Sequence, residues 1–192
     1  MPDATLIIVA VVIIGILVAA VWWYSMRQRS AKLQERFGPE YERTVAERGD
    51  TRKAEDELTD RQKRVSKLEI KPLAADERRR FNDEWQAVQA RFVDDPSAAV
   101  RDADTLVGRV MEARGYPVGD FEQRSADVSV DHPTVLEHYR AAHAVALRHA
   151  QGQASTEDLR QAMVNYRSLF DELLEEQQTV ETRPDTSPRA AS

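Results

Sequence analysis

The sequence LRQAMVNYRSLFDELL, residues 159–174, decides the fold class of this chain. Its large apolar side chains recur at the spacing of one helix face: Leu159, Met163, Tyr166, Phe170 and Leu173. Such a stripe is typical of a helix that buries one face against other helices. Ser155 and Asp158 form the pattern of an N-terminal capping box, with Asp in place of Glu. We expect a helix that begins here and fades after Glu176.

Two further amphipathic segments lie before residue 116. Four large apolar residues, spaced four, three and four apart, share one helix face: Phe81, Trp85, Val88 and Phe92. The sequence Asp94-Asp95-Pro96 then predicts a helix end, an N-terminal cap and a proline in the first turn of the next helix. That helix ends at Gly115 and carries a continuous apolar face: Val100, Ala103, Leu106, Val107, Val110 and Met111. We expect Trp85 to lie in the core.

A fourth amphipathic segment begins at His132-Pro133 and runs to about Gln151, with Gly152 as its C-terminal stop. A short helix over 121–127 fits the irregular stretch before it. Four amphipathic helices joined by short connections predict an all-α fold, with an up-and-down helical bundle over residues 72–178. No βαβ alternation is present, which argues against a nucleotide-binding sheet.

The segment before the bundle, residues 27–71, is strongly charged, with 13 cations and 10 anions. Gly38-Pro39 predicts a helix start, Gly49-Asp50 a break capped by Asp50, and Lys71-Pro72 the end of this long charged helix. A weak heptad frame places these residues on one seam: Thr51, Leu58, Arg61, Val65 and Leu68. The segment is therefore either a solvated helix that packs one narrow stripe on the domain or a self-associating coiled-coil stalk.

The run ATLIIVAVVIIGILVAAVWWY, residues 4–24, contains 21 residues without a charge. A helix of this length spans about 31 Å, close to the roughly 30 Å hydrocarbon core of a bilayer. The sequence therefore predicts an N-terminal transmembrane anchor over residues 1–26. A cleaved signal peptide is disfavoured, because the first three residues lack a cation and bulky aromatic residues occupy the place of a small-residue cleavage site.

Aromatic and cationic residues follow the apolar run and are expected at the membrane interface: Trp22, Trp23, Tyr24, Arg27, Arg29 and Lys32. Only Asp3 precedes the run. Because positive flanks stay in the cytoplasm, we expect the N-terminus outside the cell membrane and the C-terminal domain in the cytoplasm. The alternative is an exported protein with its domain outside.

The 192-residue chain has a net charge of −6 and no cysteine. The composition excludes a disulfide scaffold, a thiolate zinc site and a cysteine nucleophile. Residues 27–70 carry a net charge of +2 and residues 71–192 a net charge of −7. An acidic distal domain argues against nucleic acid as a partner, because DNA phosphates require a basic face. Residues 179–192 are polar, contain two prolines and are expected to be disordered.

No catalytic signature is present: G-x-S-x-G, GxGxxG and P-loop motifs are all missing. The four histidines lie five or six residues apart, so no two can chelate a metal from one helix. We therefore expect no enzyme activity, cofactor or metal site. If a pocket exists, polar residues at one end of the bundle are its candidates: Arg124, Asp131, His132, His138 and Arg140. Asp131 can equally be a cap for the helix that starts at Pro133.

Several segments together carry a family resemblance: RFGPEYERTV (36–45), RQKRVSKLEIKPL (61–73), ARFVDDPSAAV (90–100) and ARGYPVGDFEQRSADVSVDHP (113–133). They resemble a group of uncharacterised bacterial membrane-anchored helical proteins that are typically labelled hypothetical or secreted. The resemblance covers most of residues 33–175. It implies a membrane-anchored helical protein and brings no activity, cofactor or catalytic residue with it.

The sequence thus favours a non-enzymatic single-pass membrane protein. Its bilayer contact is residues 4–24, and its cytoplasmic bundle is a protein-interaction or scaffold module with a protein partner or a second copy. Two alternatives stay open. One is a membrane-tethered enzyme or small-ligand binder that uses residues 115–140, and the other is an oligomeric stalk built on residues 39–70.

Overall fold

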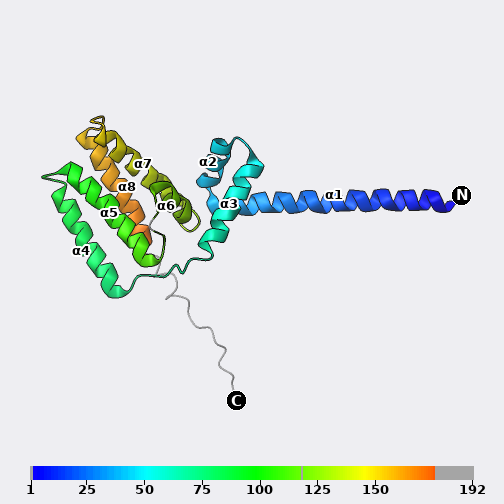
Figure 1. Cartoon of the computed structure of the whole chain (residues 1–192), viewed down its shortest axis with the longest axis horizontal. Helices are drawn as coiled ribbons and strands as arrows, with labels where there is room; N and C mark the ends of the chain where they lie inside the picture. The colour runs from blue at the N-terminus through cyan, green and yellow to red at the C-terminus, as the bar shows by residue number, and fades with distance from the viewer. Residues whose placement is uncertain (1, 118, 176–192) are drawn as a thin grey trace, which may run out of the picture. The chain divides into compact units, whose positions relative to one another are not determined.

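The computed structural model describes residues 2–117 and 119–175, with side chains from residue 13 onward. This part of the chain contains eight α-helices and no strand, which confirms the all-α class (Figure 1). It divides into two compact units, Met1–Asp60 and Arg61–Ser192. The tail expected to be disordered, residues 179–192, lies outside the described residues.

The first unit begins with one continuous helix, α1 (Pro2–Phe37), which extends beyond the predicted anchor boundary at residue 26. Gly38, with a φ of 46°, joins it to α2 (Pro39–Arg48). The break predicted at Gly49-Asp50 is confirmed: Gly49 adopts a left-handed φ of 64°, and Asp50 Oδ1 accepts a hydrogen bond from Lys53 N at 2.9 Å. After the end of α1, the charged segment therefore forms two helices, α2 and α3 (Thr51–Val65), and not one long helix.

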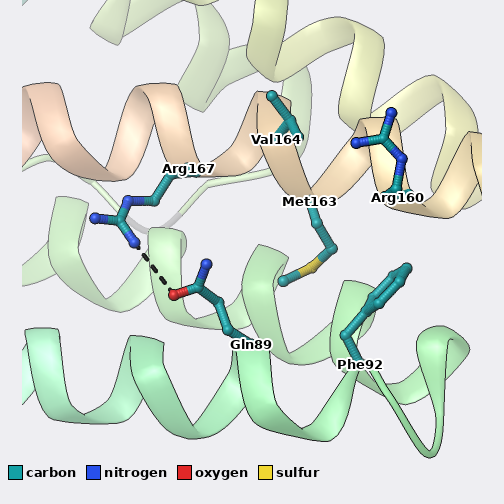
Figure 2. Close-up of a pocket in the computed structure, with 6 residues that line it drawn as sticks. All are labelled: Gln89, Phe92, Arg160, Met163, Val164 and Arg167. Atoms are coloured by element: carbon teal, nitrogen blue, oxygen red, sulfur yellow. Dashed lines mark hydrogen bonds between the residues drawn. The ribbon is translucent and has the colours of Figure 1, made fainter.

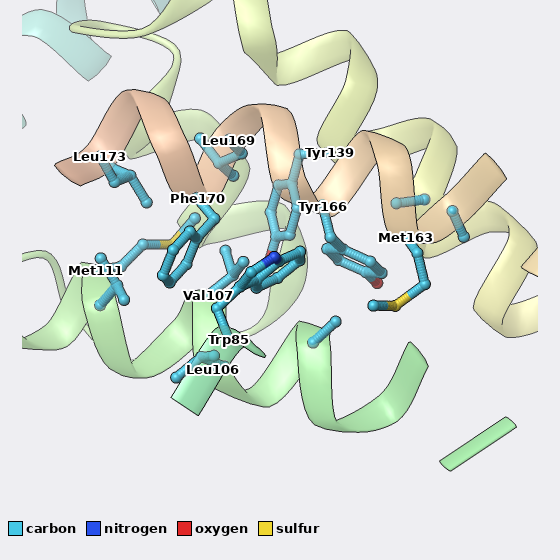
Figure 3. Close-up of a cluster of buried hydrophobic side chains, with 14 of the residues drawn as sticks. Trp85, Leu106, Val107, Met111, Tyr139, Met163, Tyr166, Leu169, Phe170 and Leu173 are labelled. Carbon is cyan, nitrogen blue, oxygen red and sulfur yellow. The ribbon is translucent and has the colours of Figure 1, made fainter. Parts of the chain in front are cut away.

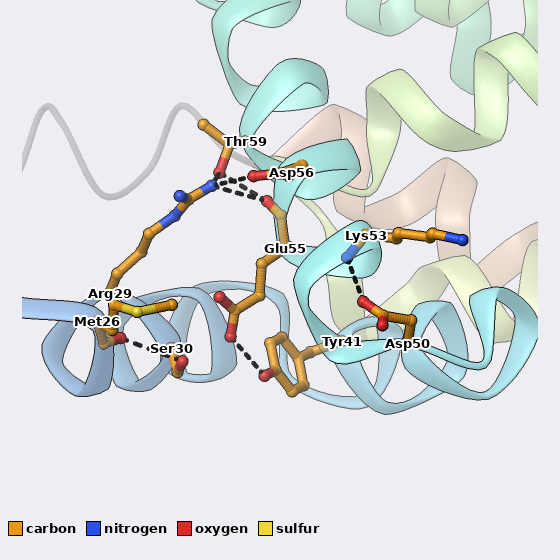
Figure 4. A network of polar contacts seen from close by, with 9 residues as sticks. All are labelled: Met26, Arg29, Ser30, Tyr41, Asp50, Lys53, Glu55, Asp56 and Thr59. Atoms are coloured by element: carbon orange, nitrogen blue, oxygen red, sulfur yellow. Dashed lines mark hydrogen bonds and ion pairs between the residues drawn. The ribbon is translucent and has the colours of Figure 1, made fainter. Parts of the chain in front are cut away.

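A polar network connects α1 to α3 within this unit (Figure 4). Arg29 Nη2 donates to Asp56 Oδ1 at 2.9 Å and to Thr59 Oγ1 at 3.0 Å. The Tyr41 hydroxyl of α2 donates to Glu55 Oε1 at 3.0 Å. Buried apolar side chains accompany these bonds: Leu33, Phe37, Tyr41, Ala54 and Leu58. The C-terminal part of α1 is thus a structural element of a small helical unit.

The second unit starts at the end of α3, which stops at Val65 and not at Lys71-Pro72 as predicted. The chain leaves the helix early because the following segment bonds elsewhere: Lys71 N donates to Arg114 O at 2.8 Å. Gly115 must be a glycine at this crossing. Its φ is 100°, and a Cβ here would lie 2.4 Å from Glu69 O.

The four predicted amphipathic helices form a helical bundle: α4 (Ala75–Arg91), α5 (Pro96–Arg114), α7 (Pro133–Ala150) and α8 (Thr156–Glu175). α4 and α5 form one hairpin, α7 and α8 form a second, and α5 packs against α8. The short helix α6 (Phe121–Val128) matches the one predicted over 121–127 and packs on α7.

The core of the bundle lies where the apolar stripes of α4, α5, α7 and α8 meet (Figure 3). Trp85 is 1% exposed and stacks on Phe170 with ring centroids 4.7 Å apart, which confirms its predicted core position. Tyr139 and Tyr166 meet edge to face at 6.0 Å. Aromatic pairs in these geometries contribute about 0.5–1.5 kcal/mol beyond their buried area.

Predicted caps hold the ends of the bundle helices. Asp95 Oδ1 accepts from Ala98 N at 2.9 Å at the start of α5. Asp158 Oδ2 accepts from Ser155 N at 2.8 Å, and Asp158 N donates back to Ser155 Oγ at 3.2 Å. These bonds satisfy N–H groups that have no partner within the helix. Both caps confirm the sequence analysis.

Candidate functional site

The polar end of the bundle is built around Arg114, the last residue of α5. Its side chain is 2% exposed, and Nη1 donates to Leu173 O at 3.0 Å. Leu173 lies in the last turn of α8, where carbonyl groups lack partners within the helix and favour a cation. Burial lowers the pKa of Arg114, while Tyr116 and Asp131 act in the opposite direction. Arg114 therefore caps α8 from another helix.

Four residues complete what we call the Arg114 cluster: Tyr116, Asp131, His132 and Glu172. The Tyr116 hydroxyl donates to Asp131 Oδ2 at 2.9 Å, and burial, reinforced by the Asp131 charge, raises the pKa of Tyr116. His132 Nδ1 lies 3.3 Å from Glu172 Oε1. Burial and then Arg114 lower the pKa of His132, which disfavours the protonated ring.

The alternative role considered for Asp131, as the cap of the helix after it, is wrong. The cap position of α7 is His132, without a side-chain capping bond, and Asp131 instead accepts from Tyr116. Asp131 thus bonds to Tyr116, 15 positions away, and does not cap the first turn of α7. The Arg114 cluster thus fixes the 115–133 connection to α5 and α8.

A second polar group, the Arg124 cluster, lies between α5, α6, α7 and α8: Asp104, Arg124, Tyr139, His143 and Tyr166. A Cβ at Gly108 would lie 2.8 Å from Arg124 Nη1, so this glycine of α5 leaves room for the guanidinium group of α6. Burial raises the pKa values of both tyrosines, and the Asp104 carboxylate adds to the effect.

His143 contributes an aromatic face to this cluster. It stacks on Phe121 with ring centroids 3.6 Å apart and an interplanar angle of 8°. Burial lowers the pKa of His143, although Asp104 opposes the shift. The Tyr139 hydroxyl is buried and makes no hydrogen bond to the residues that the structure describes. The Arg124 cluster is thus a group of half-buried polar side chains packed against the buried Tyr139 and Tyr166.

The five candidate residues predicted from the sequence do not form one site. Asp131 and His132 belong to the Arg114 cluster, whereas Arg124 belongs to the Arg124 cluster. His138 Nδ1 lies 3.2 Å from Asn165 Oδ1, which connects α7 to α8. Arg140 is half-buried on α7. Among the described residues, no group of three or more histidine or acidic side chains is placed to hold a metal ion.

The residues expected at the membrane interface follow one another along α1. Trp22, Trp23 and Tyr24 are exposed, and the Arg27 guanidinium lies 5.4 Å from the Trp23 ring centroid. Arg29 instead turns to α3, and Lys32 is exposed. Over residues 13–117 and 119–175, whose side chains the structure describes, no helix has both the length and the apolar character needed to cross a membrane.

Two grooves flank α4, and the sequence analysis did not identify either. The groove between α4 and α8 has a volume of about 260 Å³ and is lined by Gln89, Phe92, Arg160, Met163, Val164 and Arg167 (Figure 2). The groove between α4 and α5 has a volume of about 290 Å³. The only signal in the sequence was the pattern R-x-x-M-V-x-x-R over residues 160–167, beside the apolar stripe of α8.

Comparison of the chain with protein-family models, curated proteins and solved structures finds no match.

Proposed function

We propose that the protein is a single-pass membrane-anchored interaction module. Residues 4–24 cross the membrane, and the helical bundle binds a protein partner at the cytoplasmic face. The observation that carries the anchor is the run of 21 uncharged residues inside one helix, Pro2–Phe37. From Ile13 to Tyr24 its large apolar side chains are 52–68% exposed, which is costly in water.

Orientation follows from the residues around the run. Trp22, Trp23 and Tyr24 suit the headgroup level, where an aromatic ring has an apolar and a wet side. Arg27 and Lys32 follow them, whereas Asp3 is the only charged residue before the run. The positive-inside rule then places the bundle in the cytoplasm.

Interaction with a protein is the role that the bundle supports best. The buried titratable side chains of the bundle make structural hydrogen bonds: Arg114 caps α8, and Tyr116 donates to Asp131. These contacts stabilise the fold. A stalk is less well supported, because Leu58 and Val65 of its seam are already buried in a single chain. The grooves beside α4 remain open to a partner.

Affinity purification tests this function. The full chain is extracted from native membranes in mild detergent, and its partners are compared with those of Phe170→Ala, which keeps the anchor but loses the aromatic core contact with Trp85. We expect at least one protein to be recovered only with the native chain. Equal recovery with both chains, or none with either, would contradict an interaction module.

A further inference from the structure

We infer that the groove between α4 and α8 binds an acidic amphipathic helix of a partner protein, with two carboxylates paired to Arg160 and Arg167. The inference rests on the proposed function and names the chemistry of the partner. The six residues that line the groove include two arginines and no acidic residue, although residues 71–192 as a whole carry a net charge of −7.

The floor of the groove is apolar. Met163 of α8 and Phe92, at the end of α4, extend into it from opposite walls (Figure 2). Val164, with 46% of its surface exposed, also lines the groove. A volume of about 260 Å³ is smaller than the roughly 300–1,000 Å³ of small-molecule pockets. The groove therefore suits a few side chains of a protein rather than a cofactor.

The two arginines are held in position by acidic neighbours on their own helix. Arg160 bonds to Glu157 through Nε and Nη2, and Arg167 bonds to Asp171 through Nε. Arg167 Nη1 also donates to Gln89 across the groove at 3.2 Å. Nη1 of Arg160 and Nη2 of Arg167 make no hydrogen bond to the described residues. Each guanidinium is thus oriented and keeps a terminal N–H pair for a carboxylate.

The second groove, between α4 and α5, lacks this arrangement. It is lined by both signs of charge, and these charges pair across the two helices: Arg109 with Glu84, and Arg91 with the lining residue Asp102. A charged partner would have to break those pairs. In the α4–α8 groove, the carboxylates that pair with Arg160 and Arg167 belong to α8 and are not lining residues, and the contact across the groove is to the neutral Gln89.

Spacing defines the partner more closely. Arg160 and Arg167 are seven residues apart, about 10.5 Å along the helix axis, and Met163 and Val164 lie between them. A helix with acidic residues at positions i and i+7 and apolar residues at i+3 and i+4 presents all four on one face. The expected recognition sequence is therefore E-x-x-L-L-x-x-E on a helix packed along α8.

A synthetic peptide tests this inference. The probe is an alanine-rich helical peptide of about 18 residues that carries E-x-x-L-L-x-x-E and a fluorescent label. Its fluorescence anisotropy is titrated with the full chain in a non-ionic detergent. We expect a dissociation constant of about 10–500 µM, because the contact is smaller than that of stable complexes. The matched peptides replace both Glu residues with Gln or with Lys.

Binding must depend on the acidic residues and on the groove. We expect the Gln peptide to bind several-fold more weakly and the Lys peptide not to bind measurably. Arg160→Gln should weaken binding about two- to fivefold, as expected for an exposed ion pair. Val164→Asp should weaken it more than about tenfold, because it places a carboxylate on the apolar floor. Arg148→Gln, an exposed arginine of α7, is the control and should leave affinity unchanged.

Several outcomes would overturn the inference. Equal binding of the Glu and Lys peptides would show apolar contact without charge recognition, and no binding of the Glu peptide would exclude the stated partner. Self-association that Val164→Asp abolishes would make a second copy the occupant, and binding that appears only after removal of residues 176–192 would make that segment the occupant. None of these outcomes affects the proposed function, which the affinity purification of the native chain and Phe170→Ala tests independently of the peptide.

Discussion

Two apolar stretches of this chain have opposite surroundings. Large apolar side chains of α1, from Ile13 to Tyr24, are 52–68% exposed, whereas the apolar residues of the α8 stripe are at most 8% exposed. The difference lies in how each stretch distributes its side chains. The α8 stripe covers one face and is buried by α5 and α7, while the α1 run is apolar all round and no packing on one side can cover it. This all-round exposure of apolar side chains is the reason for our proposal that the stretch lies in a membrane.

The largest expected effect comes from charging the exposed stretch. Ile14→Arg with Val18→Arg places two cations near the middle of residues 4–24. Each costs about 2.5–3.5 kcal/mol at the centre of a membrane-spanning helix, so the pair shifts the balance by about 5–7 kcal/mol towards release. The measurement is the fraction of the chain in the membrane pellet after alkaline carbonate treatment, which should fall strongly.

The control for that experiment is Val93→Arg, which charges an apolar side chain that is 84% exposed on the bundle. It should leave the pellet fraction unchanged. If both variants stay in the pellet, the exposed stretch is not what holds the chain at the membrane.

Phe170→Ala tests the buried stripe of α8. This change removes a fully buried ring that stacks on Trp85, and we expect a loss of about 3–5 kcal/mol in the free energy of unfolding. Urea unfolding, followed by Trp85 fluorescence in a Trp22→Phe, Trp23→Phe background, measures the loss. Val164→Ala, on the exposed side of α8, should change stability by less than about 0.5 kcal/mol. Similar losses in both variants would refute the stated division of α8 into two faces.

A smaller effect is expected at His132, where polar groups brace the bundle. Burial and then Arg114 lower its pKa, while Glu172 and Asp131 partly oppose them. Below the unfolded value of about 6.5 the unfolded chain therefore binds the proton more tightly. Stability should be constant above about pH 7 and fall as the pH decreases towards 5, by at most about 1.4 kcal/mol per pH unit for this residue.

The same unfolding experiment at several pH values checks this dependence. His132→Gln should flatten the slope between pH 7 and 5, although His143, whose pKa is also lowered, maintains part of it. His138→Gln changes an exposed histidine of α7 and serves as the control. A slope that survives His132→Gln unchanged would contradict the assignment.

The smallest expected changes in stability come from removing the hydroxyl groups of two buried tyrosines. Tyr139→Phe removes a hydroxyl without a hydrogen bond to the described residues, so stability should stay constant or rise by up to about 1 kcal/mol. Tyr116→Phe removes the bond to Asp131 and should cost about 0.5–1.5 kcal/mol. Differential scanning calorimetry on the two variants compares them, and a larger loss for Tyr139→Phe would reverse the assignment.

Local signals made much of the fold predictable. The Asp95 cap and the Ser155–Asp158 capping box involve residues three positions apart, and the stripe that contains Trp85 needs only helical periodicity. Such features depend on the backbone geometry of one element and can be read from a single sequence.

Contacts between distant residues were not predictable in the same way. Arg114 caps α8 through Leu173, 59 residues away, and Arg64 pairs with buried Asp127 across 63 residues. The early end of α3 and the displacement of Asp131 from its expected cap follow from contacts of this kind. The α4–α8 groove was missed for the same reason, because its two walls come from helices that the sequence does not pair.

The most direct test of the central claim is the topology of the chain. Because the native chain has no cysteine, Asp3→Cys and Gln153→Cys each introduce one thiol, and intact cells are treated with a membrane-impermeant thiol reagent. We expect labelling of the chain with Asp3→Cys, and protection of the chain with Gln153→Cys until the membrane is permeabilised. Labelling at position 153 on intact cells would contradict a membrane-anchored module that faces the cytoplasm.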